Sequence, residues 1–136
     1  MENISKNVSW KEATYSNTAV ANKIQNIPSA KELETMKLTA TKCFEPLREW
    51  YGKPIKINSF YRCPELNTKV GGSKTSEHVL GQAIDIDTDS VEENKKLFDW
   101  CKKNLQFNQL IWEYNGAWIH ISYKESGNKN QILEIR

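Results

Sequence analysis

The chain contains the run LIWEYNGAWIHI, residues 110–121, in which two apolar segments flank an Asn-Gly pair. Such a pair is a strong signal for a β-hairpin, because both residues tolerate the positive φ that a two-residue turn requires. We therefore predict two antiparallel strands joined by Asn115-Gly116. Since side chains alternate between the faces of a strand, Glu113 and His120 are expected on the same face of the sheet.

The segments around the hairpin predict helices and further short strands. Ser29 with Glu32, and Ser90 with Glu93, match the capping box that opens a helix. Pro46 is expected to kink or interrupt the first of these helices. The expected elements are a helix over 30–51, strands at 55–60 and 82–87, a loop at 63–75 with a helical turn around Leu66, a helix over 91–104 and a last strand at 131–135. Helices segregated from a small, mostly antiparallel sheet define an α+β domain.

With 136 residues, the chain is long enough to bury the core of one domain but not of two. We expect a single domain over 1–136. Residues 1–28 are polar and are expected to form a peripheral segment with one or two short helices. The scattered apolar residues expected to anchor this segment are Trp10, Tyr15, Val20 and Ile27.

Charge and hydropathy argue against several classes of partner. Lys+Arg 19 against Asp+Glu 17 leaves a small positive charge spread along the chain, which does not favour nucleic-acid binding. The N-terminal residues contain no apolar run long enough for a signal peptide or a membrane span. The expectation is a monomer made in the cytoplasm without nucleic-acid or membrane partners.

The three cysteines, Cys43, Cys63 and Cys101, lie far apart and include no Cys-x-x-Cys pair. This odd, widely spaced set argues against a disulfide framework and against a cysteine zinc site. We expect free thiols that are buried or half-buried.

The only two histidines, His78 and His120, lie in short motifs. Residues 76–85 follow Ser-x-His-x-x-Gly-x-Ala-x-Asp and end at Asp85, and residues 118–120 follow Trp-x-His. Two imidazoles and a carboxylate form a ligand set that leaves a fourth position of tetrahedral Zn²⁺ open for water. Each motif alone favours a core histidine or a solvated strand face, but their joint occurrence favours a metal site.

These motifs resemble those of the zinc D-Ala-D-Ala carboxypeptidase family, peptidase M15. The resemblance implies a fold shared with that family and with hedgehog signalling domains, a Zn²⁺ ion held by His78, Asp85 and His120, and hydrolysis of an amide bond in peptidoglycan stem peptides. Members of the family cut either the terminal D-Ala-D-Ala bond or an L-Ala-D-Glu or cross-bridge bond.

A wall enzyme without a signal peptide is expected to reach peptidoglycan through a phage programme, as an endolysin or virion part, or after release by lysis. Two alternatives to an enzyme remain open: a non-catalytic, zinc-containing wall-binding module of a virion, and a structural or signalling domain of the same fold.

The segment Ser59-Phe60-Tyr61-Arg62 directly follows a predicted strand and resembles the Ser-x-x-Arg segment of the family. The resemblance implies that Arg62 lies beside the zinc and holds the substrate and the developing oxyanion. A guanidinium suits this role because it is always charged and donates in a fork. The alternative is a surface arginine paired with a glutamate.

Four residues near the ligands receive weaker assignments. Ser76 is expected to orient His78 or to touch the substrate. Glu77 is expected at the surface. Asp87 shares the face of the aspartate ligand and is expected either to orient a ligand or to be solvated. Trp118 is expected to be an ordinary hairpin aromatic that also walls the substrate cleft.

The sequence lacks a general base at the positions where many relatives carry one. Many relatives carry Glu-x-x-His or His-x-His, but the corresponding positions here are Ala117 and Trp118. With the predicted turn, Glu113 opposes Trp118 and Ile111 opposes His120, so Glu113 lies diagonal to His120 at roughly 7–8 Å between backbones. We predict Glu113 as the base. The alternative is a cross-strand or surface role for this glutamate.

Overall fold

The computed structural model describes residues 2–136 and has one five-stranded sheet. Its strands are β1 (Lys56–Ser59), β2 (Ala83–Asp87), β3 (Gln109–Glu113), β4 (Trp118–Ser122) and β5 (Gln131–Glu134). They lie in the order β1-β2-β4-β3-β5, and only the β3–β5 pair is parallel. The predicted α+β class is confirmed.

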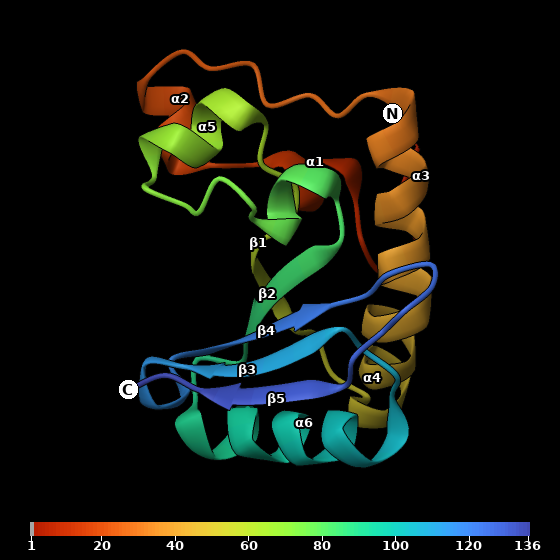
Figure 1. Ribbon diagram of the computed structural model, residues 1–136. Helices are drawn as coiled ribbons and strands as arrows, with labels where there is room; N and C mark the ends of the chain where they lie inside the picture. The colour runs from red at the N-terminus through yellow and green to blue at the C-terminus, as the bar shows by residue number, and fades with distance from the viewer. Residues whose placement is uncertain (1) are drawn as a thin grey trace.

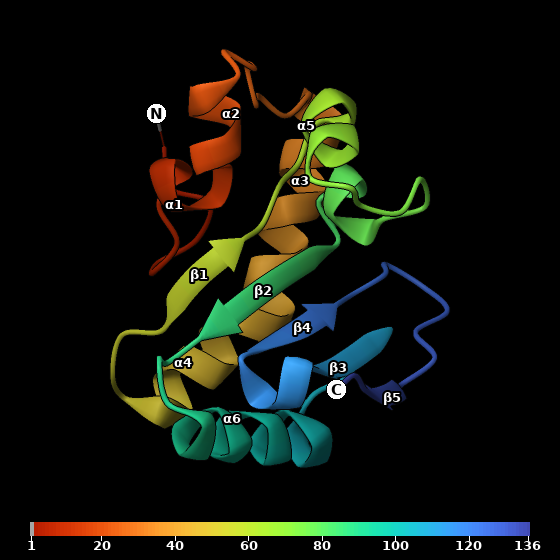
Figure 2. The same cartoon turned by 90° about the vertical axis from the view of Figure 1, so that its left-hand side faces the viewer.

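Helices surround the sheet at its ends and on one side. They are α1 (Trp10–Thr14), α2 (Asn17–Ala21), α3 (Ala30–Thr39), α4 (Glu45–Tyr51), α5 (Pro64–Lys69) and α6 (Val91–Asn104), with shorter turns η1 (Ala40–Phe44), η2 (Glu77–Leu80) and η3 (Tyr114–Gly116). In both views α6 lies at one end of the molecule beside β3 and β4, while α1, α2 and α5 gather at the opposite end (Figures 1 and 2). The rod formed by α3 and α4 runs between the two ends (Figure 1).

One face of the sheet packs into the core, and the other carries polar side chains. Ile84 and Ile86 of β2 pair with Ile121 and Ile119 of β4, and all four are buried in the core. Helices α3, α4 and α6 add their apolar side chains to the same core, among them Met36, Leu47, Leu97 and Phe98. Since alternate residues point to opposite faces, Asp85 lies on the other face of the sheet, which is free for a site.

The first long helix begins at the predicted cap and is interrupted near Pro46, as predicted. Ser29 and Glu32 form a reciprocal capping box at the start of α3. Pro46 has no N–H to donate to the carbonyl four residues earlier, and the backbone widens into the π-helical turn η1 just before it. The chain stays helical to Tyr51 and ends at Gly52 in the left-handed conformation.

The hairpin has the predicted register but a different turn. Glu113 pairs with Trp118, as expected, but Tyr114 also adopts positive φ, so the connection is longer than the predicted two-residue turn. Contacts outside the hairpin stabilise this shape. The carbonyl of Gly116 accepts a hydrogen bond from Asn94 of α6, and the N–H of Asn115 donates to the carbonyl of residue 135. A hairpin considered alone could not have revealed these partners.

The N-terminal segment forms the two predicted short helices, but the prediction of its anchors was largely wrong. Trp10 packs against the core, whereas Tyr15, Val20 and Ile27 are 53%, 67% and 60% exposed. The buried anchors are other apolar side chains, namely Ile4, Val8, Ala13 and Ala19. The segment is also joined to the body by hydrogen bonds, such as that from Tyr61 N–H to the carbonyl of Ala13.

Other local predictions are confirmed in part. Helix α5 contains Leu66, and strand β5 occupies most of the predicted last strand. Ser90 caps α6 by accepting from the N–H of Glu93, but its own N–H donates to Thr88, so the second hydrogen bond of the predicted capping box does not form. All three cysteines are free, with Cys43 and Cys101 buried. Among the described residues, no helix is both long and apolar enough to cross a membrane.

Gly81 links the first metal-site motif to the long helix. It has a φ of +77°, and an added Cβ would lie 2.9 Å from the carbonyl oxygen of Glu32 and 2.7 Å from the Met36 side chain. The glycine therefore permits a close approach of this turn to α3.

We expect Gly81→Ala to lower the free energy of unfolding by about 1–3 kcal/mol, because it combines backbone strain with a clash against α3. Gly52→Ala is the matched control, since Gly52 has a similar φ of +72° and no neighbour within 4 Å of an added Cβ. Urea unfolding of both variants should show the larger loss for Gly81→Ala. Equal losses would mean that the contact with α3 relaxes without cost.

Candidate metal centre

His78 is oriented by the main chain of a neighbouring segment. Its Nδ1 lies 2.7 Å from the carbonyl oxygen of Phe60, and because a carbonyl only accepts, Nδ1 must carry the proton. The other nitrogen, Nε2, lies 3.2 Å from Oδ2 of Asp85 but is buried without a hydrogen bond of acceptable geometry. The imidazole thus turns the nitrogen that is not held by Phe60 toward Asp85.

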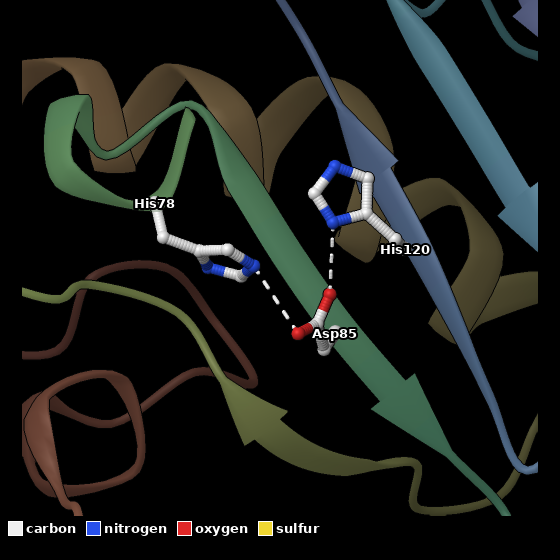
Figure 3. Close-up of side chains that lie close together, drawn as sticks. All are labelled: His78, Asp85 and His120. Carbon is white, nitrogen blue, oxygen red and sulfur yellow. Dashed lines mark hydrogen bonds and ion pairs between the residues drawn. The ribbon is translucent and has the colours of Figure 1, made fainter. Parts of the chain in front are cut away.

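His120 and Asp85 are brought together by the sheet. They are direct partners in the β2–β4 register, and Nδ1 of His120 lies 3.0 Å from Oδ1 of Asp85. The carboxylate of Asp85 therefore lies between the two imidazoles, one oxygen toward each (Figure 3). One ligand atom from each of His78, Asp85 and His120 lies within 4.8 Å of the others.

This geometry fits a divalent metal ion. A buried imidazole nitrogen with no hydrogen bond, beside a carboxylate and a second imidazole, matches a three-ligand site of nitrogen and oxygen donors. The second nitrogen of His78 is held by a main-chain carbonyl, which is how metal-bound histidines are commonly oriented. The structure thus brings together the three residues predicted as ligands.

The charges at the centre are strongly coupled. Burial raises the pKa of Asp85, but the two histidines outweigh it and hold that pKa well below its usual range. Burial lowers the pKa of His120, yet its hydrogen bonds to Asp85 and Glu77 raise it to about 9. The two carboxylates thus favour the protonated form of His120, and a metal ion bound to this histidine would displace a proton.

Glu77 was expected at the surface, and the structure contradicts this. Its Oε1 lies 3.3 Å from Nε2 of His120, and its Oε2 accepts a hydrogen bond of 2.9 Å from the side chain of Asn108. Burial raises the pKa of Glu77, but these hydrogen bonds lower it below the usual range. The sequence pattern has no local signal for this contact, because Glu77 and His120 are 43 positions apart.

A groove of about 870 Å³ opens over the metal centre. The three ligands line it together with other predicted site residues, namely Arg62, Ser76, Glu113 and Trp118. Trp118 forms part of the wall, where its ring lies 4.9 Å from that of Tyr114 between centroids. The groove is open to solvent.

Arg62 is half-buried beside the centre. Its Nη2 lies 3.5 Å from the hydroxyl of Ser76, its Nε is buried without a partner, and its guanidinium forms no ion pair within the part of the chain that the structure describes. Burial lowers the pKa of Arg62, while the charge of Asp85 opposes the shift. The predicted alternative, a surface pair with a glutamate, does not form, so donors of Arg62 are available to a ligand in the groove.

The hydroxyl of Ser76 contacts both His78 and Arg62. It accepts from the N–H of His78 at 3.3 Å. It caps η2, and it joins the turn that carries His78 to the arginine.

Glu113 lies on the face predicted for it. Ile111 pairs with His120 and Glu113 pairs with Trp118, so the glutamate is two positions further along the same face. It lines the groove with the metal ligands. Burial raises the pKa of Glu113, and the negative charge of Asp85 raises it further. A carboxylate with a raised pKa that lies in a groove is suited to accept and release a proton.

Asp87 is placed away from the centre. It accepts hydrogen bonds from Asn94 and from the N–H of Asp89, and it lies 3.8 Å from Lys56. None of these partners is a residue of the metal centre. Asp87 therefore stabilises the end of β2 and the start of α6, and it does not orient a ligand.

A comparison with protein-family models matches residues 6–122 to the model described as peptidase M15. The chain belongs to the peptidase M15 family. The match includes the three ligands, Arg62 and Glu113, and it supports a peptidase of the metal-dependent type. A comparison with curated proteins gives no match. Strand β5 lies beyond the matched residues.

Asp85 and Asp87 provide a matched pair for testing metal binding. They lie on one face of one strand, but only Asp85 belongs to the metal centre. Zn²⁺ added to metal-free protein should stabilise the wild type and Asp87→Asn by about 2.7 kcal/mol at a hundredfold excess over the dissociation constant. Asp85→Asn should gain little. A thermal melt with and without the ion measures this, and an equal gain in both variants would refute the ligand assignment.

Proposed function

We propose that this chain is a zinc-dependent peptidase that hydrolyses an amide bond in the peptide stems of peptidoglycan. The observation that carries the proposal is the His78–Asp85–His120 cluster at the base of a groove that also holds Glu113 and Arg62. Membership of the peptidase M15 family supports peptide hydrolysis.

The donor set supports zinc as the metal. Two imidazole nitrogens and one carboxylate oxygen are a common set for catalytic zinc, and they leave one position open. When bound at this centre, zinc would lower the pKa of a water molecule and polarise the carbonyl of the substrate.

Glu113 would move the proton during hydrolysis. Its carboxylate would take a proton from the attacking water and deliver it to the nitrogen of the leaving amine. The raised pKa of Glu113 supports this role, since a base that must later act as an acid works best near the ambient pH. Glu113 stands in for the glutamate that many relatives carry three residues before the last ligand.

Arg62 would bind the substrate and stabilise the charge that develops on the carbonyl oxygen. Its unpartnered Nε and its position in the groove wall leave N–H donors for this contact. Donors fixed before the reaction stabilise an oxyanion more than mobile water can.

We infer the substrate, a peptide stem of peptidoglycan, from the groove and from the family resemblance. An open groove along the sheet suits an extended peptide, and the family resemblance points to peptidoglycan stems cut either at a terminal D-Ala-D-Ala bond or at an internal bond. We propose a monomer that reaches the wall by phage delivery or by lysis and has no nucleic-acid or membrane partner.

A digest of purified peptidoglycan, analysed by mass spectrometry, tests both the activity and the bond. Wild-type protein should release peptides from one defined bond, and Glu113→Gln should lower the rate by roughly 10²–10⁴, as loss of a general base costs. The substitution preserves shape, so zinc content should not change. Glu34→Gln, which alters an exposed glutamate on α3, is the control. Zinc binding without any digestion by the wild type would instead favour the non-catalytic wall-binding module.

Arg62→Lys tests the role of the guanidinium. Lysine retains the charge but loses the fork of donors. The rate should therefore fall by at least roughly tenfold, and by at most the roughly 10²–10³ that complete loss of an oxyanion donor costs. Zinc content and the melting temperature should stay near those of the wild type. Arg48→Lys on α4 serves as the control, and an unchanged rate for Arg62→Lys would remove Arg62 from the reaction.

A further inference from the structure

The imidazole of His120 is held from both sides. Nδ1 faces Asp85 at 3.0 Å, and Nε2 faces Glu77 at 3.3 Å. Histidine offers a metal only one nitrogen at a time, and the hydrogen bond of the other nitrogen decides which one is free. A carboxylate only accepts when ionised, so Glu77 requires the proton to be on Nε2.

The carboxylate of Glu77 is itself fixed in place. Its second oxygen accepts 2.9 Å from Nδ2 of Asn108, a residue that is only 6% exposed. The main-chain N–H of Asn108 donates to Ser122 at the end of β4, and its carbonyl accepts from Gln131 at the start of β5. Glu77 is thereby joined to the two strands on either side of β3, one of which lies outside the family match.

Glu77 lies behind His120 as seen from the metal centre. The carboxylate contacts the nitrogen that points away from Asp85, and among the described residues the set of converging ligand atoms includes only His78, Asp85 and His120. Glu77 is therefore placed to hold a ligand and not to be one.

We propose that Glu77, fixed by Asn108, is a positioning residue that holds His120 with Nδ1 toward the metal. The inference rests on the proposed zinc centre. His78 is oriented in the same way, but its acceptor is the main-chain carbonyl of Phe60, which substitution cannot remove. Glu77 is a side chain, so the contribution of this orientation can be measured.

The first test measures zinc affinity by competition with a chromogenic chelator, which needs no peptidoglycan. Glu77→Ala should bind Zn²⁺ roughly 10- to 100-fold more weakly, as loss of a partner behind a ligand usually costs. Glu77→Gln should restore part of the affinity, because its single amide oxygen can still accept from Nε2, while its NH2 group then faces the Nδ2 donor of Asn108. Asn108→Ala should cause a smaller loss than Glu77→Ala, since it loosens Glu77 without removing it. Glu93→Ala, which removes a half-buried, hydrogen-bonded carboxylate on α6, is the matched control and should have wild-type affinity.

The second test observes the contact itself by proton NMR of the zinc-loaded protein. The wild type and Glu77→Gln should show a protected Nε2–H resonance from His120, and Glu77→Ala should lose it to exchange with water. Wild-type affinity in Glu77→Ala, or a protected resonance in that variant, would overturn the positioning role alone. A wild-type protein that binds no Zn²⁺ would overturn the proposed function and this inference together.

Discussion

The pairing of β2 with β4 is the constraint on which the site depends. It places Asp85 directly opposite His120, so that two ligands of different chemistry meet without any loop between them. The apolar residues on the other face maintain this register, because Ile84 and Ile86 must remain in the core beside Ile121 and Ile119. A slip by one residue would exchange the two faces and expose the core while burying the carboxylate. Burial of the core therefore also fixes Asp85 opposite His120.

The centre combines groups that are unfavourable when buried alone. A buried carboxylate is costly unless it is paired, and Asp85 is paired with an imidazole on each side. Each imidazole in turn has an acceptor at its other nitrogen, Phe60 for His78 and Glu77 for His120. The ring orientations are set before any metal arrives, which reduces the reorganisation that binding would otherwise require.

The hairpin places the proposed base, Glu113, in a chain that has neither the Glu-x-x-His nor the His-x-His pattern. Glu113 lies on β3, two positions from the Ile111 that pairs with His120, and it lines the groove with the metal-site residues. Its placement depends on the turn that follows, which is held by Asn94 of α6 and by the carbonyl of residue 135. The turn next to the proposed base is thus held by elements that are remote from it in the chain.

Local physics was sufficient for much of this structure. The caps at Ser29 and Ser90, the interruption before Pro46 and the hairpin register all follow from interactions among near neighbours, and the sequence by itself determined them. The ligand motifs also pointed to residues that the fold brings together.

Only the tertiary structure decided which polar side chains reach the centre. Glu77 and Asp87 are both acidic and close to a ligand in sequence, yet Glu77 contacts His120 and Asp87 contacts Asn94 and Lys56. The anchors of the N-terminal segment were likewise undecided, because burial of Ala13 and exposure of Tyr15 depend on the surface that the segment meets. The contact of Glu77 with His120 joins positions 43 apart, so no periodicity or spacing within one segment can encode it.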